Sequence, residues 1–175
     1  MIGKLIGGFI VVSALAMGIA LYYFQTQAFY EPVAATGERD VQVTVLASGQ
    51  PEPILFEDFE AIDADSSPIR YRACFTTTMS QPMMTETFLP YERAEPKVAP
   101  KWFECFDADE IGAALRNGSA LAFMGTENIE YGIDRIVAVM ADGRGFAWHQ
   151  INRCGEIAFD GDPLPPSCPP KPEGQ

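Results

Sequence analysis

The longest apolar segment of the chain runs from Leu5 to Phe24. It spans twenty residues without a charged side chain, and Ser13 is its only classical polar residue. As an α-helix it would extend over about 30 Å, which matches the hydrocarbon core of a bilayer. Aromatic residues gather at its C-terminal end, as in the interfacial belts of membrane proteins: Tyr22, Tyr23, Phe24, Phe29 and Tyr30. The pattern predicts one transmembrane helix within an anchor of residues 1–30.

The charges that flank this segment predict its orientation. Lys4 precedes it and the first acidic residue, Glu31, follows it, which favours a cytoplasmic N-terminus and an exported body. A cleaved signal peptide is the alternative, because Ala14–Ala16 has an A-x-A pattern and Leu5–Val12 would form a short apolar core. The apolar run continues for eight residues beyond that site, from Met17 to Phe24, which favours the uncleaved anchor. Both alternatives export the rest of the chain.

Small residues fall on two faces of the predicted helix. At 100° per residue, four of them lie within about 60° of one another: Gly3, Gly7, Ala14 and Gly18. A second small face holds Ser13, Ala16 and Ala20. Membrane helices approach closely through such faces, because larger side chains hold the backbones apart. Glycine is also common in membrane helices generally, so ordinary composition is the alternative explanation. The first face is the candidate helix-packing site.

Beyond the anchor, short alternating segments predict a sheet. Residues 31–40 include Pro32 and Gly37 and are expected to form a linker. Apolar alternation or short apolar runs then predict the following strands: 41–45, 54–62, 69–75, 120–124, 136–140 and 146–151. Asp142–Gly145 separates the last two strands and is a strong hairpin signal. Most of these strands are therefore expected to pair in antiparallel fashion.

One helix is predicted between the third and fourth strands. Asp107 is its expected N-cap, Glu110 would complete a capping box, and Gly118 ends it. Residues 76–101 carry four spaced prolines and predict a long irregular insert, a feature that is often functional. Residues 163–175 form a proline-rich tail. The fold class is therefore α+β, with a small, mainly antiparallel domain over residues 41–162.

The charge of the body excludes some classes of partner. Residues after position 30 carry 11 Lys and Arg against 24 Asp and Glu, a formal charge of −13. This balance argues against nucleic acid, whose phosphates need a basic surface. A basic protein would be attracted to the body. Solubility alone is the simpler explanation of the acidity.

The four cysteines indicate two disulfides in an exported domain. Three connectivities are possible. We favour Cys74–Cys105, which would close the base of the insert, and Cys154–Cys168, which would hold the tail. Neither pair has the C-x-x-C spacing of a redox enzyme or zinc site.

Catalytic signals are weak. His149 is the single histidine, and no nucleophile motif accompanies it, so a structural role is expected. Met79, Met83 and Met84 lie in the insert, and their thioethers are ligands suited to Cu(I). The alternative is that they dock the insert on an apolar surface. We expect neither an enzyme nor a bound cofactor.

Three segments carry a resemblance to a known family: residues 1–10, 62–75 and 142–149. Through them the chain resembles small single-pass envelope proteins of photosynthetic and related alphaproteobacteria, whose function is uncharacterised. The resemblance implies a bacterial inner-membrane setting and supplies no functional residues.

These observations together lead to one main expectation about function. It is a non-catalytic accessory subunit or assembly factor of an inner-membrane complex, with a respiratory or photosynthetic electron-transfer complex as host. A basic periplasmic protein such as a cytochrome c would meet the acidic body. The alternatives are an anchored ligand- or copper-binding module and a cleaved, freely soluble exported protein.

Overall fold

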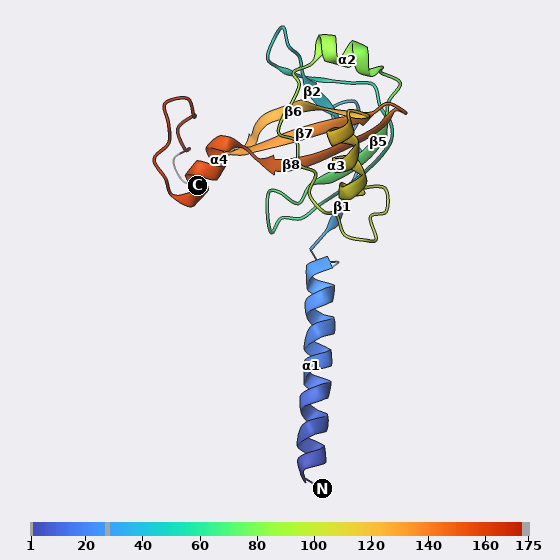
Figure 1. The fold of residues 1–175 in the computed structure, drawn as a ribbon, viewed down its shortest axis with the longest axis vertical. Coiled ribbons are helices and arrows are strands. Elements are labelled where there is room, and N and C mark those ends of the chain that lie inside the picture. The colour runs from blue at the N-terminus through green and yellow to red at the C-terminus, as the bar shows by residue number, and fades with distance from the viewer. Residues whose placement is uncertain (1, 27–28, 173–175) are drawn as a thin grey trace.

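A computed structural model describes residues 2–26 and 29–172 (Figure 1). Helix α1 (Ile2–Thr26) projects from one end of a folded body. The apolar side chains of α1 that the structure describes are exposed, and none of its apolar stretch is covered by the body. Among the described residues, α1 is the one helix that is long and apolar enough to cross a membrane. A membrane anchor and a signal sequence both fit this finding.

The body is built on a six-stranded sheet in which all neighbouring strands are antiparallel. In spatial order the strands are β1 (Glu31–Val33), β4 (Glu57–Asp63), β5 (Arg72–Thr76), β8 (Arg144–Ile151), β7 (Ile133–Met140) and β6 (Ala120–Glu130). A separate two-stranded sheet consists of β2 (Gln42–Thr44) and β3 (Pro51–Pro53). It lies against β6, where the Thr44 hydroxyl donates to the Gly125 carbonyl at 2.9 Å.

Both faces of the large sheet are buried. Along β7, Val137 and Val139 face one apolar cluster, while Ile136 and Ala138 face the other, as the two-residue period of a strand requires. The first cluster is covered by residues from the small sheet and from α2 (Gln81–Thr87). The second is covered by the segment before α3 (Ala108–Asn117) and by α3 itself. The body therefore has three layers with the large sheet in the middle.

Local capping explains where α3 begins and ends. The Asp107 side chain accepts hydrogen bonds from the backbone N–H groups of Asp109 and Glu110, and Gly118 ends the helix with a φ of 79°. The helix predicted from the sequence is therefore present. The Glu110 carboxylate does not serve the capping box, because it pairs with Arg144 at 2.9 Å on the neighbouring hairpin.

The α+β, mainly antiparallel fold class is confirmed, and two more helices accompany the expected one. The insert of residues 76–101 was expected to be irregular, which is wrong where α2 forms. Ser80 caps α2 and Pro82 occupies its first turn, where a missing N–H has no cost. Helix α4 (Arg153–Asp160) follows β8 and begins at Asn152, which caps it.

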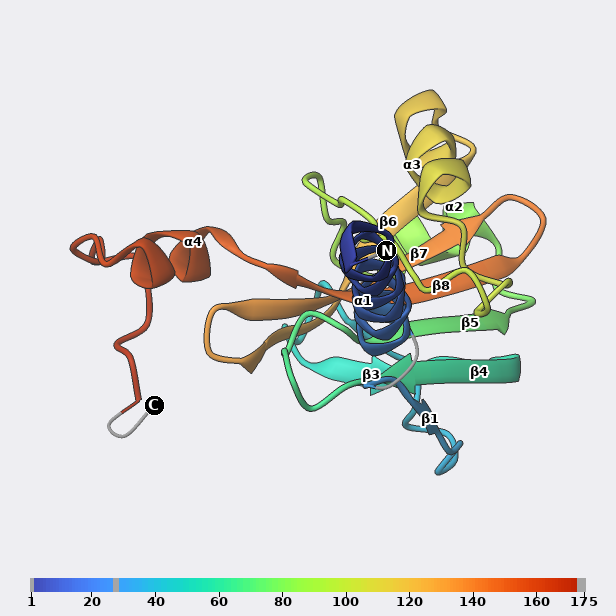
Figure 2. The ribbon, with the colours of Figure 1, turned by 90° about the horizontal axis from the view of Figure 1, so that it is seen from below.

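The boundary between anchor and body also differs from the expectation. The first three residues of the predicted linker form β1, which pairs with β4 at the edge of the sheet. The yellow-green segment that precedes α3 and the green loop after β4 lie at the end of the body nearest α1 (Figures 1 and 2). Helix α2 lies at the opposite end (Figure 1).

Candidate functional site

A polar hollow of about 390 Å³ lies beside the second disulfide. Its walls come from the segment after α2, the β6–β7 hairpin, the end of β8 and the tail. The residues that form it are Pro90, Tyr91, Glu92, Arg93, Glu127, Asn128, Asp134, Gln150, Ile151, Asn152, Arg153, Cys154, Ser167 and Pro169. This hollow combines buried polar side chains with a charged rim. For that reason we take it as the candidate binding site.

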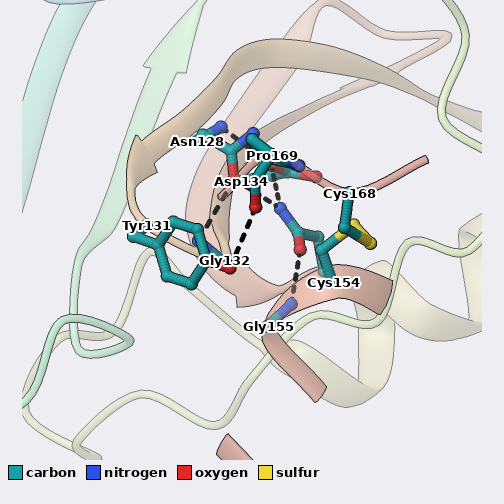
Figure 3. Close-up of a disulfide and its surroundings, with 9 residues drawn as sticks. Asn128, Tyr131, Gly132, Asp134, Cys154, Gly155, Cys168 and Pro169 are labelled. Carbon is teal, nitrogen blue, oxygen red and sulfur yellow. Dashed lines mark hydrogen bonds between the residues drawn. A yellow bond between two sulfur atoms is a disulfide. The ribbon is translucent and has the colours of Figure 1, made fainter. Parts of the chain in front are cut away.

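Asp134 on β7 is the centre of a hydrogen-bond network in this hollow (Figure 3). Its buried carboxylate accepts from the Asn128 backbone N–H at 2.9 Å and from the Asn152 side-chain amide at 2.8 Å. The Asn128 side-chain oxygen accepts from the Gly132 N–H at 3.1 Å and from the Asn152 amide at 3.0 Å. These bonds fix the end of the β6–β7 hairpin, where Asn128 in β6 has a φ of 47°.

Two further polar side chains join the insert to this network. The Tyr91 hydroxyl donates to Asp134 at 3.4 Å, and burial together with the Asp134 charge raises the pKa of Tyr91 to about 12. The Gln150 side chain accepts from the Glu95 N–H at 2.8 Å and donates to the Arg93 carbonyl at 2.7 Å. The insert is therefore held against the end of the sheet by side chains of β7 and β8.

The Cys154–Cys168 disulfide connects α4 to the tail on the other side of the hollow (Figure 3). Asn152 accepts from the Gly155 N–H at 2.9 Å, which caps α4 beside Cys154. The Tyr131 hydroxyl donates to the Pro169 carbonyl at 3.2 Å, so the tail also contacts the β6–β7 turn. The hollow thus has walls that are fixed by covalent and hydrogen bonds.

The buried polar groups of the hollow are engaged within the chain. Asp134, Asn152 and Gln150 use their polar atoms on other parts of the chain. The rim carries the exposed side chains of Glu127 and Arg153. Cys154, which lines the hollow, is held in a disulfide.

His149 on β8 belongs to a separate group of packed side chains, outside the polar hollow. Its Nδ1 lies 2.7 Å from the Pro68 carbonyl oxygen, and its Nε2 accepts from the Arg135 Nε at 3.0 Å. The imidazole stacks on Tyr71 at 4.8 Å, and the Arg135 guanidinium lies 4.0 Å from the centre of the same ring. Burial, and then the Arg135 charge, lower the pKa of His149 to about 4. The imidazole is therefore neutral at pH 7 and joins three segments of the chain.

The three methionines of the insert have different surroundings. Met84 is fully buried in the first apolar cluster, Met79 packs partly buried against that cluster, and Met83 is exposed on α2. Burial of Met84 favours the docking role over a copper ligand set. Among the described residues, no group of three His, Cys, Asp or Glu side chains could hold a metal ion.

The other predicted site residues are found as follows. Cys74 pairs with Cys105 and Cys154 with Cys168, the connectivity favoured from the sequence. The small residues of the helix-packing face lie on the exposed α1: Gly3, Gly7, Ala14 and Gly18. The sequence patterns did not predict the polar network of the hollow. Its one local signal was Asn152, an N-cap residue directly before a short helix.

The fold and the site define a disulfide-bonded α+β domain that follows an exposed apolar helix. The chain belongs to the family of unknown function DUF6446, whose model matches residues 41–169. This match includes both disulfides and the polar hollow and begins after α1. It confirms that the chain resembles an uncharacterised family. No curated protein and no solved structure matches the chain.

Proposed function

We propose that this protein is a non-catalytic accessory subunit or assembly factor of a bacterial inner-membrane complex. Its N-terminus would lie in the cytoplasm, α1 would cross the membrane, and the body would lie in the periplasm. A respiratory or photosynthetic electron-transfer complex is the proposed host. The single observation that carries the proposal is the exposed, apolar surface of α1 with its face of small residues.

The small face of α1 is open to a partner helix. A Cβ added at Gly3, Gly7 or Gly18 would meet no atom within 4 Å. Apolar side chains around the rest of α1 are exposed as well. A surrounding lipid bilayer would explain why the large apolar side chains of α1 are exposed. Close contact with another helix would explain the face of small residues.

The properties of the body support the same proposal. Two disulfides are typical of a compartment outside the cytoplasm. The body's charge of −13 suits a basic partner such as a cytochrome c, because opposite charges speed association. The non-catalytic role is supported by the buried polar groups of the hollow, which bind other parts of the chain.

Purification of the tagged full-length chain in a mild detergent tests the proposal. We expect stoichiometric recovery of an integral-membrane partner with the wild type, and its loss with Gly7→Leu, which would hold the helices apart. Gly8→Leu is the matched control: Gly8 lies about 100° around the helix from Gly7, and its Cβ would also meet open space. This variant should keep the partner.

Two outcomes would contradict the proposal. Recovery of the wild type alone, with no stoichiometric partner, would rule out a subunit. Sequencing of the mature N-terminus tests anchorage separately, since a chain that begins after Ala16 would have lost most of α1.

A further inference from the structure

A series of aromatic contacts leads from the end of α1 into the body. The ring centres of Phe24 and Phe29 are 6.1 Å apart. The next residue, Tyr30, packs edge to face on Trp102 at 6.3 Å, and Trp102 packs in the same way on Phe103 at 6.2 Å. Phe103 belongs to the second apolar cluster. Trp102 therefore lies between the exit of α1 and the core of the body.

The segment that carries Trp102, residues 97–105, is held firmly to the sheet; we refer to it as the Trp102 loop. The buried Arg72 on β5 donates to the carbonyls of Lys97 at 2.8 Å and Val98 at 3.2 Å. At its other end, Cys105 forms a disulfide with Cys74 on the same strand. The backbone of the loop is thus held against the sheet at both ends.

Two apolar side chains of this fixed loop face solvent in the structure. Val98 is 79 % exposed and Trp102 is 41 % exposed. Lys97 and Lys101 flank them. Exposed Phe29 lies on the chain between α1 and β1. Val98 and Trp102 lie four residues apart on one short loop, and tryptophan is a side chain that prefers the interface between a membrane and water.

The position of the loop indicates what covers it. Four residues separate the end of α1 at Thr26 from the start of β1 at Glu31, a connection that spans at most about 18 Å. The Trp102 loop lies at the end of the body nearest α1 (Figures 1 and 2). The polar layer on each side of a bilayer is about 5–7 Å thick and is the layer that tryptophan and tyrosine prefer.

We propose that the Trp102 loop docks in the phospholipid headgroup layer of the membrane that holds α1, with Trp102 and Val98 inserted. This inference rests on the membrane anchorage proposed above. Docking at this second point, away from the helix axis, fixes the orientation of the body over the membrane. The polar hollow and the acidic surface are then presented at a constant angle to a partner.

The contact is interfacial rather than electrostatic. Lys97 already pairs with Glu95 at 3.1 Å. Acidic side chains also lie near the exit of α1, where Glu31, Asp63 and Asp65 line one pocket with Phe29. These carboxylates would repel anionic lipid. Docking is therefore expected in purely zwitterionic phosphatidylcholine and is expected to persist at high salt.

Tryptophan fluorescence of the full-length chain in phosphatidylcholine nanodiscs tests the proposal, because the chain has two tryptophans. Trp148 is fully buried in the body and serves as the internal control. A nitroxide on the lipid headgroup should quench the Trp102 emission strongly, and a nitroxide at the end of the acyl chain should quench it less. Trp102→Phe should abolish the quenchable component and leave the Trp148 spectrum unchanged.

A pair of surface variants tests the role of the loop without touching the fluorophore. Val98→Asp should reduce the headgroup quenching of Trp102. Leu46→Asp is the matched control, because Leu46 is also an exposed aliphatic residue, at 48 %. Its N–H donates to Thr87 at the end of α2, and α2 lies at the opposite end of the body (Figure 1). This variant should leave the quenching unchanged.

The outcomes separate this inference from the proposed function. Absence of headgroup quenching in a chain retained by the nanodisc would overturn the docking and leave the anchorage intact. Quenching equal in wild type and Val98→Asp would likewise overturn it. A native chain whose N-terminus begins after Ala16 would remove the anchorage itself.

Discussion

Gly132 and Gly155 are in direct backbone contact. A Cβ added to Gly155 would lie 2.1 Å from the carbonyl oxygen of Gly132, and one added to Gly132 would lie 2.5 Å from the Cα of Gly155. Gly132 also has a φ of 76°, which glycine adopts without strain. This contact places the first turn of α4 against the β6–β7 turn, and with it Cys154 beside the polar hollow.

Gly155→Ala should therefore destabilise the body by about 3 kcal/mol, because the overlap is with backbone that has to move. Gly161→Ala is the control, since Gly161 ends the same helix with a φ of 82° and has open space around it. Its cost is the left-handed conformation alone, about 1 kcal/mol. Thermal unfolding of the detergent-solubilised chain measures both. Equal effects would contradict the backbone contact.

The two disulfides should have different effects when removed. Cys74–Cys105 joins β5 to the Trp102 loop across 31 residues, and its replacement by alanines should lower the free energy of unfolding by about 4 kcal/mol in the chain-entropy model. Cys154–Cys168 closes 14 residues and ties only α4 and the tail. The same model gives about 3 kcal/mol for this shorter loop, so its replacement should lower the melting temperature less than loss of the first disulfide and should expose the tail to proteolysis. A larger drop for the second disulfide than for the first would contradict this order.

Elements with strong local signals were predictable from the sequence. The β7–β8 hairpin forms around Asp142–Gly145, and α3 begins at its capping residue Asp107. The edge strand β1 was missed because it has three residues and depends on pairing with β4. Strand β6 continues to Glu130, beyond the predicted end at Met124. The prediction stopped there because register shifts after Met124 interrupt the alternation of side chains.

The candidate site was less predictable for a related reason. Tyr91, Asn128, Asp134 and Asn152 meet through tertiary contacts between the insert, the hairpin and the start of α4. Their spacing in the sequence follows no motif, so no local pattern brings them together. The cysteines were an exception, because a closed loop and a proline-rich tail each offered an obvious use for a disulfide.

Arg72 should be essential for holding the Trp102 loop. It is buried and donates to four carbonyls, those of Ile69, Tyr71, Lys97 and Val98. Burial lowers the pKa of Arg72 to about 10, which still leaves it protonated at pH 7. Arg72→Met should cost about 3 kcal/mol, because those carbonyls lose their donor while remaining partly buried. Thermal unfolding measures the loss.

Trypsin cleavage at Lys97 and Lys101 gives a local readout of the same substitution. Cleavage should accelerate in Arg72→Met, and less so in Arg72→Lys, whose single ammonium reaches fewer of the carbonyls. Arg39→Met is the control, because Arg39 is exposed in the segment between β1 and β2. Unchanged cleavage in Arg72→Met would show that the Trp102 loop is held by other contacts.

His149 should make the body less stable in mild acid. Its folded pKa is about 4 because burial and the Arg135 charge disfavour the imidazolium, whereas an unfolded histidine titrates near 6.5. The unfolded state thus binds more protons between these values, and stability falls as the pH drops from about 6.5 to 4. The loss reaches about 3 kcal/mol, since each pKa unit corresponds to about 1.4 kcal/mol.

His149→Gln removes this titration while carboxylates elsewhere still titrate, so the difference in unfolding free energy between wild type and variant isolates the histidine. That difference should change by the stated amount across this pH range and stay constant above pH 7. A constant difference throughout would contradict the prediction, because it would mean that the histidine has the same pKa in the folded and unfolded states.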